Sequence, residues 1–168
     1  ADAVEEYDVW WLEDPVPPEN LDVQKEVTDS TTTPICVGEN RYRVTEERRL
    51  IEDQCVDIIA PDMPKVGGMR ETRKIADVAN QYYVPVAMHN VSSPIGTMAS
   101  AQVGAAIPNS LAVEYHSYEL PWWSDLVEET VIEDGYIDIP EQPGLGLTLD
   151  LDTVEAHMVD GETLFDAA

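Results

Sequence analysis

The stretch that decides the fold is VDIIAPDMPKVGGMRETRKIADVANQYYVPVAMH, residues 56–89. Each end of it is a short apolar run, with the length of a buried strand, that finishes in an ionisable residue. Between the runs, the Gly pair at 67–68 is typical of a tight turn, and Arg70–Tyr82 places its apolar residues on one face of a helix. The stretch therefore predicts a strand–helix–strand unit, in which the helix connects two parallel strands.

The same unit repeats along the chain, because short runs rich in Val and Ile alternate with segments of helical periodicity. Strands are predicted at Val9–Glu13, Pro34–Glu39, Val56–Asp62, Val84–His89 and Ser110–Tyr115. Helices are predicted at Glu19–Ser30, Thr45–Gln54, Met69–Tyr82 and Ile95–Ile107. Continuous apolar strands separated by helices indicate an α/β fold with a parallel sheet that is buried on both faces.

The ends of the strands favour a barrel over an open sheet. Each predicted strand finishes at or beside an ionisable residue, and these lie 23 to 27 residues apart: Glu13, Glu39, Asp62, His89 and Glu114. In an open sheet, only the strands next to the switch point need polar ends. In a (β/α)₈ barrel, every strand brings its C-terminal end to one shared mouth, where the active site lies. Five polar ends in register therefore predict a barrel.

Five strands are too few to close such a barrel, which has eight. The sequence therefore predicts a partial barrel over residues 1–117, comprising strands four to eight, and an extension over 118–168 that packs on the barrel or on a capping region. This extension is rich in Pro and Trp and holds a short helix-like segment, Val154–Val159. We expect the missing strands to precede this sequence in the functional protein, and the 168 residues alone to be inactive.

The charge of the chain limits its partners. Thirty-four acidic residues against nine Lys and Arg give a formal net charge of −25. Such a charge excludes general affinity for nucleic acid or for anionic membranes. It indicates a surface adapted to concentrated salt, with a special cationic partner as the alternative. The sequence has no apolar run long enough to cross a membrane and an acidic start, so we expect a cytoplasmic protein.

The five strand-end residues form the candidate site. Glu13 and Glu39, on neighbouring strands, are hard oxygen donors of the kind that Mg²⁺ prefers. Asp62 and His89 end the next two strands, where a carboxylate could fix the tautomer of a histidine base. Glu114 could exchange a proton or anchor a substrate hydroxyl. Any one of them alone is better explained as a helix cap, a surface ion-pair partner or a structural histidine, but five in register favour a functional site.

Other polar and aromatic residues have simpler explanations. The two cysteines lie in apolar contexts and are expected to be free and buried. His116 follows the last strand and could touch substrate, whereas His157 is expected to be exposed in the tail. Trp122 and Trp123 indicate packing or a subunit contact. We considered Lys65 as a base, but its position in a Gly-flanked segment favours a charged loop residue.

Taken in order, WLEDPVPPEN, PICVGEN, DIIAPDMPKVGG, VAMHN and LAVEY resemble the mandelate racemase/muconate lactonizing branch of the enolase superfamily, from about Val9 to the PGLGL at 143–147. The resemblance implies a barrel whose Mg²⁺ is held by three acidic strand ends, of which Glu13 would be the second and Glu39 the third. It implies that His89, paired with Asp62, removes the proton alpha to a substrate carboxylate, and that Glu114 supports the enediolate. The first metal ligand belongs to a strand that this sequence lacks.

Within this branch, the WLEDPVPPEN motif and the tail after Glu114 are most similar to sugar-acid dehydratases, which act on aldonates. The resemblance thus implies loss of water from a small sugar acid to give a 2-keto-3-deoxy acid, in an enzyme that is expected to be a homo-oligomer. A racemase or epimerase of the same superfamily remains an alternative, because its second base would lie on the strands that are missing. A non-catalytic barrel scaffold is the alternative from another class.

Overall fold

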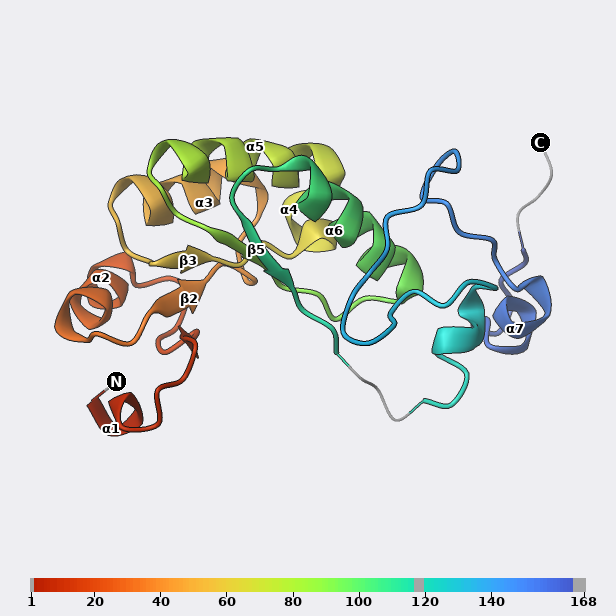
Figure 1. Cartoon of the computed structure of the whole chain (residues 1–168), viewed down its shortest axis with the longest axis horizontal. Helices are drawn as coiled ribbons and strands as arrows, with labels where there is room; N and C mark the ends of the chain where they lie inside the picture. Colours follow the sequence, from red (N-terminus) through yellow and green to blue (C-terminus); the bar gives the residue numbers. More distant parts are fainter. Residues whose placement is uncertain (1, 117–119, 165–168) are drawn as a thin grey trace.

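Five parallel strands form one sheet in which each strand pairs with the next along the chain, in the order β1-β2-β3-β4-β5 (Figure 1). The structure is a computed structural model and describes residues 2–116 and 120–164. The strands are β1 (Leu12–Glu13), β2 (Ile35–Val37), β3 (Ile58–Ile59), β4 (Val86–Met88) and β5 (Ser110–Val113). The five predicted strands and their parallel arrangement are confirmed.

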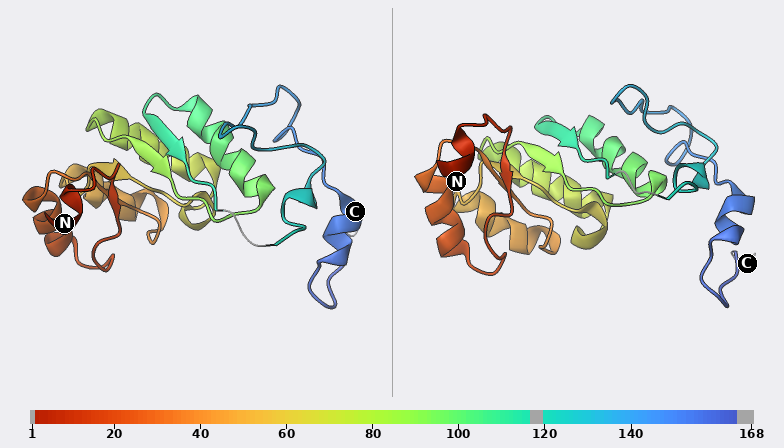
Figure 2. Two further views of the ribbon diagram at one scale, coloured as in Figure 1. Left: turned by 60° about the horizontal axis from the view of Figure 1, so that its bottom comes forward. Right: turned by 90° about the horizontal axis from the view of Figure 1, so that it is seen from below.

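Helices connect the strands and cover one face of the sheet (Figures 1 and 2). They are α2 (Leu21–Ser30), α3 (Arg43–Glu52), α4 (Met63–Val66), α5 (Met69–Gln81) and α6 (Pro94–Ala106), and a further short helix, α1 (Asp2–Glu5), precedes β1. Each of the four longer ones occupies a predicted helical segment. None of the helices in the described part of the chain is long and apolar enough to cross a lipid bilayer.

Alternation along the strands divides the buried side chains between two faces. On β2, Ile35 and Val37 join the main core under the helices, whereas Cys36 faces the other side. The smaller cluster on that other face consists of Cys36, Ile58, Ala60 and Ala87, with Trp11 packed against it. In a barrel, the helix-covered face lies outside and the opposite face lines the interior, so this cluster marks the interior side.

Three details differ from the sequence prediction. The hydrogen-bonded strands are shorter than the apolar runs, because the polar ends of those runs leave the ladder and turn into loops. Helix α3 begins at Arg43 rather than Thr45, and the Glu46 carboxylate accepts a hydrogen bond from the backbone N–H of Tyr42 at 2.9 Å. The segment after Asp62, predicted as a loop, contains the short helix α4.

The tail has little regular structure and extends beyond α6 (Figure 1). It contains the 3₁₀ helix η1 (Ser124–Leu126) and α7 (Leu151–Ala156), which begins three residues before the predicted Val154–Val159. Its Leu145 packs against the main core. The predicted domain boundary between residues 117 and 118 lies outside the described residues, so the division into two domains stays a prediction.

Candidate active site

The five predicted site residues all lie at the C-terminal edge of the sheet. Glu13 is the last residue of β1, and His89 and Glu114 directly follow β4 and β5. Glu39 and Asp62 lie two and three residues beyond β2 and β3. Because adjacent strands keep their side chains in register, Glu13 shares the interior face with its pairing partner Cys36. The residues therefore reach one rim, on the interior side.

Asp62 and His89 form a direct pair. The Nδ1 atom of His89 lies 2.8 Å from Oδ2 of Asp62. Because an ionised carboxylate can only accept a hydrogen bond, the Nδ1–H of His89 is the donor. Both side chains are buried, with 7% of His89 and 3% of Asp62 exposed. The second Asp62 oxygen accepts the backbone N–H of Lys65 at 3.0 Å and thereby caps α4. The pair predicted from the two strand ends is thus present, and the turn-capping explanation of Asp62 also holds.

Two further carboxylates face the other nitrogen of His89. Its Nε2 lies 2.9 Å from Oε2 of Glu39 and 3.7 Å from Oε2 of Glu114. The hydrogen bond to Asp62 raises the pKa of His89, burial opposes that rise, and the negative charges of Glu39 and Glu114 add to it. For Asp62, burial acts to raise the pKa, but the hydrogen bonds from His89 and the Lys65 backbone lower it overall. The pair therefore combines an imidazole whose pKa is raised with a carboxylate whose pKa is lowered.

Carboxylates crowd the rim beside β1 and β2. Burial raises the pKa of Asp14, and the negative charges of Glu39 and Glu13 raise it further. Such crowding favours a cation, and carboxylate oxygens are the donors that Mg²⁺ prefers. Within residues 2–116 and 120–164, no three His, Cys, Asp or Glu side chains are placed to enclose a metal ion. Glu13 and Glu39 are oxygen donors of this kind, and two carboxylates alone do not complete the coordination of Mg²⁺.

Lys65 lies closer to the site than the sequence indicated. It belongs to helix α4 rather than to a loop, and its Nζ lies 3.9 Å from Oε1 of Glu39 and 3.8 Å from Oδ2 of Asp62. The prediction of a charged loop position is therefore wrong. The lysine supplies positive charge between the third predicted metal ligand and the Asp–His pair.

Two asparagines that the sequence analysis did not select hold the site carboxylates. The Nδ2 of Asn40 donates to Asp14 and to Glu39, at 3.1 Å in each case. The backbone N–H of Asn90 donates to Oε2 of Glu114 at 2.9 Å, and its buried side chain donates to the Glu114 carbonyl and to Thr97. Both asparagines directly follow a predicted site residue, and that adjacency is the signal that could have identified them.

The histidine, tryptophan and cysteines that the sequence explained without a role in the site have packing or surface positions. His157 is exposed on the tail and stacks on Trp122, with ring centroids 4.0 Å apart, which agrees with a packing role for that tryptophan. Cys36 and Cys55 are free and buried, as predicted.

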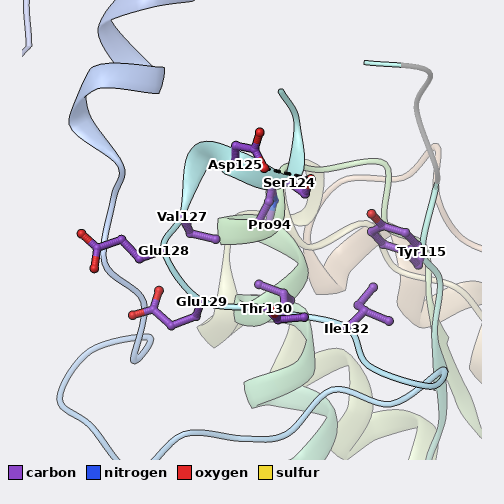
Figure 3. A pocket seen from close by; sticks show the side chains of 10 residues that line it. Pro94, Tyr115, Ser124, Asp125, Val127, Glu128, Glu129, Thr130 and Ile132 are labelled. Carbon is purple, nitrogen blue, oxygen red and sulfur yellow. Dashed lines mark hydrogen bonds between the residues drawn. The ribbon is translucent and has the colours of Figure 1, made fainter. Parts of the chain in front are cut away.

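A pocket of ≈ 340 Å³ between the start of α6 and the tail is lined by Tyr115 and Glu129 but by none of the five site residues (Figure 3). A second pocket, of ≈ 330 Å³, contains Glu13, His89 and Glu114.

A parallel sheet covered by helices, with an acid–base pair and crowded carboxylates at its C-terminal edge, defines the class of barrel enzymes with the active site at the mouth. Comparison with known families places the chain within that class. Residues 1–153 match the model of the enolase C-terminal domain-like family, and the chain belongs to this family. The sheet is the C-terminal part of a (β/α)₈ barrel.

Relatives and solved structures agree with this assignment. The chain is 77% identical over 167 residues to D-xylonate dehydratase of Haloferax volcanii, covering 99% of this chain and 40% of the relative. It is 35% identical to a D-galactonate dehydratase family member of Streptomyces bingchenggensis, covering 88% of this chain and 36% of the relative. The chain thus spans about two fifths of the length of these curated relatives.

Among solved structures, a mandelate racemase/muconate lactonizing enzyme-like protein of Rubrobacter xylanophilus superposes with a TM-score of 0.90 at 46% identity, covering 95% of this chain and 41% of that one. The 3,6-anhydro-D-galactonate cycloisomerase of Zobellia galactanivorans superposes with a TM-score of 0.85 at 32% identity, covering 93% and 44%. The resemblance to the mandelate racemase/muconate lactonizing branch is confirmed.

Proposed function

We propose that the protein containing this chain is a Mg²⁺-dependent sugar-acid dehydratase. The observation that carries the proposal is the arrangement around His89, whose Nδ1 is fixed by Asp62 at 2.8 Å while Nε2 faces the carboxylates of Glu39 and Glu114. One nitrogen is thus held in a defined protonation state, and the other faces the interior of the rim. This is the arrangement that a general base needs.

In this proposal, His89 removes the alpha proton of the substrate. The proton leaves C2 of the sugar acid for Nε2, and Asp62 stabilises the imidazolium that results. Since Nε2 must be neutral to accept a proton, its 2.9 Å contact with Glu39 has to open when substrate binds. The electron pair left on C2 forms the enediolate, and the hydroxyl on C3 then leaves as water with the proton that Nε2 of His89 has taken up. Tautomerisation of the resulting enol gives the 2-keto-3-deoxy acid.

Glu13 and Glu39 are the proposed ligands for Mg²⁺ in this chain. A Mg²⁺ ion bound there would stabilise the second negative charge that develops on the substrate carboxylate as the alpha proton leaves. Glu114 would donate a hydrogen bond from a carboxylic acid O–H to an enediolate oxygen. Its Oε2 is held by the backbone N–H of Asn90 at 2.9 Å, and 41% of the side chain remains exposed toward the rim. We assign the first metal ligand to barrel strands outside this chain.

D-Xylonate is the first substrate to test. The name of the relative at 77% identity supports this choice, and names of relatives at 31–35% identity support an aldonate in general. We further propose that the enzyme works in the cytoplasm at high salt as a homo-oligomer. We also propose that residues 1–117 belong to the barrel and 118–168 to an extension that packs on it, and the contact of Leu145 with the main core supports that packing.

The test is His89→Asn in the complete protein, with His157→Asn as the matched control because His157 is exposed and distant from the rim. Removing the general base should lower the rate of D-xylonate dehydration by about 10²–10⁴-fold. Exchange of the alpha proton with deuterated solvent, measured by NMR, should fall by a similar factor. His157→Asn should behave like the wild type.

The two measurements also separate the alternatives. Alpha-proton exchange without loss of water, accompanied by the C2 epimer, would identify a racemase or epimerase. Neither exchange nor dehydration in the wild-type protein, with Mg²⁺ and a panel of aldonates, would favour a scaffold. Unchanged exchange of the alpha proton in His89→Asn would show that another residue is the general base.

A further inference from the structure

The side chain of Trp11 contacts Glu13, one of the two proposed metal ligands in this chain. Its indole Nε1 lies 2.8 Å from Oε2 of Glu13. An indole N–H can only donate, so the carboxylate accepts, and it does so through one defined oxygen. Hydrogen bonds from a neutral donor to a carboxylate are among the stronger ones in proteins.

The indole is held in place by the sheet itself. Trp11 precedes Glu13 by two residues, so the extended chain directs both side chains to the interior face. There the ring packs against the cluster of Cys36, Ile58, Ala60 and Ala87, whose members are mostly small. A large flat ring fills the space that small neighbours leave, and its orientation determines where the N–H points. The donor is therefore fixed by packing before any ligand arrives.

A fixed donor has a use at this position because the rim is crowded with negative charge. The Nδ2 of Asn40 donates to Asp14 and to Glu39 at 3.1 Å each, so these two carboxylates lie close together, and Glu13 directly precedes Asp14 in the chain. Repulsion would turn an unrestrained Glu13 away from its neighbours. An oriented carboxylate instead keeps one oxygen on the donor and leaves the other for a cation.

We propose that Trp11 is a positioning residue for Mg²⁺ binding, acting through its indole N–H on Glu13. The inference rests on the proposed function in that Glu13 is taken as a metal ligand. It parallels the hydrogen bonds that orient ligands in other metal sites, whose removal lowers metal affinity about 10- to 100-fold. The inference predicts that removing the indole N–H weakens Mg²⁺ binding even when the size of the ring is kept.

The test is Trp11→Phe in the complete protein, with Mg²⁺ alone titrated by isothermal calorimetry in the absence of substrate. Phe keeps an aromatic ring in the pocket and removes the donor. The Kd for Mg²⁺ should rise by about tenfold or more. Trp10→Phe is the matched control, because Trp10 is 63% exposed and its ring contacts that of Trp11 at a centroid distance of 4.7 Å. The Kd of this variant should stay within about twofold of the wild type.

A second variant keeps the size of the ring. Incorporating 3-benzothienylalanine at position 11 replaces the indole N–H by sulfur, so it tests the donor even if Trp11→Phe folds poorly. It should weaken Mg²⁺ binding about as much as Trp11→Phe does, with an unchanged melting temperature in EDTA.

The outcomes are distinct. Wild-type affinity for Mg²⁺ in the benzothienyl variant would overturn the inference and leave the proposed function intact. An equal loss in Trp10→Phe would also overturn it, because packing of the tryptophan pair would then explain the effect. A wild-type protein that binds no Mg²⁺ would instead remove the proposed function itself.

Discussion

Glu47 is a carboxylic acid on helix α3 with no exposed surface. Neither of its oxygens has a hydrogen-bond partner within the described part of the chain. Burial raises its pKa well above the ordinary value of 4.5, the positive charge of Arg41 opposes this, and the negative charges of Glu46 and Asp14 add to it. The folded protein therefore binds this proton more tightly than the unfolded chain does.

This has a consequence for stability. Because the folded pKa is raised, the stabilising contribution is complete below about pH 4.5 and is lost as the pH rises through the folded value. Glu47→Gln, which cannot ionise, should be more stable than the wild type at neutral pH by about 1–3 kcal/mol. The difference should vanish toward acid pH. Melting temperatures across the pH range test this, and Glu26→Gln at an exposed position of α2 should change them little. A constant difference at all pH values would contradict the prediction.

The sequence predicted the five rim residues because they end consecutive strands, and parallel strands deliver their ends to one edge. It did not predict the donors Trp11, Asn40 and Asn90. Their roles depend on rotamers and on the path of the loop beyond each strand, which periodicity does not encode. Lys65 was misjudged for the same reason: a two-glycine sequence indicated a loop, but Asp62 caps a short helix there and turns the lysine toward Glu39.

At the scale of the elements, the connection between β2 and Glu39 depends on Gly38. Its φ of +156° lies outside the range that other residues usually adopt, and a Cβ built there would lie 2.8 Å from the backbone carbonyl carbon of Ala60. This close approach packs the end of β2 directly against Ala60, the residue after β3. The conflict is with backbone, so no side-chain movement can relieve it.

Gly38→Ala should therefore destabilise the protein by about 3 kcal/mol or more, because β2 and β3 would have to separate. Urea unfolding measures this. Gly104→Ala is the control, since its Cβ would meet only the Ser110 hydroxyl at 3.2 Å and a Val113 methyl at 3.5 Å. That exchange also gains helix propensity, so its change in unfolding free energy should stay within about 1 kcal/mol. Equal effects of the two substitutions would show that strand separation is not the cause.

The positions of the helices were predicted to within a few residues because their amphipathic faces are strongly periodic. Helix α5 shows this best, since the face with Ile75, Ala76 and Ala79 is fully buried against the sheet. The short helix α4 has only four residues, too few for a periodic pattern to reveal. The tail could not be predicted because its contacts, such as Leu145 on the main core, depend on tertiary packing alone.

At the scale of the whole molecule, the net charge of −25 is the dominant property. Screening shortens the range of repulsion between exposed charges from about 10 Å at 0.1 M salt to about 3 Å at 1 M. We therefore expect KCl to stabilise the folded protein between 0.2 and 2 M. A gain on the order of 3 kcal/mol would raise the Tm by roughly 10 °C.

Differential scanning calorimetry measures this dependence. A triple variant that removes three exposed negative charges combines Glu19→Gln, Glu26→Gln and Glu155→Gln. It should be more stable than the wild type at low salt, and its Tm should rise less with KCl. Sucrose, which stabilises folded proteins without screening charge, should affect both proteins equally. If the variant and the wild type respond equally to KCl, repulsion between exposed carboxylates is not the cause.

The strand order β1-β2-β3-β4-β5 also bears on how the chain acquires its structure during synthesis. Every strand pairs with the one made just before it, so each new pairing closes a loop of a single strand–helix unit. The entropy lost in closing a loop grows with its length, and here that cost is similar at each step. We expect the units to dock one after another as they leave the ribosome, so that the rim is assembled in the order in which its residues are translated, from Glu13 to Glu114.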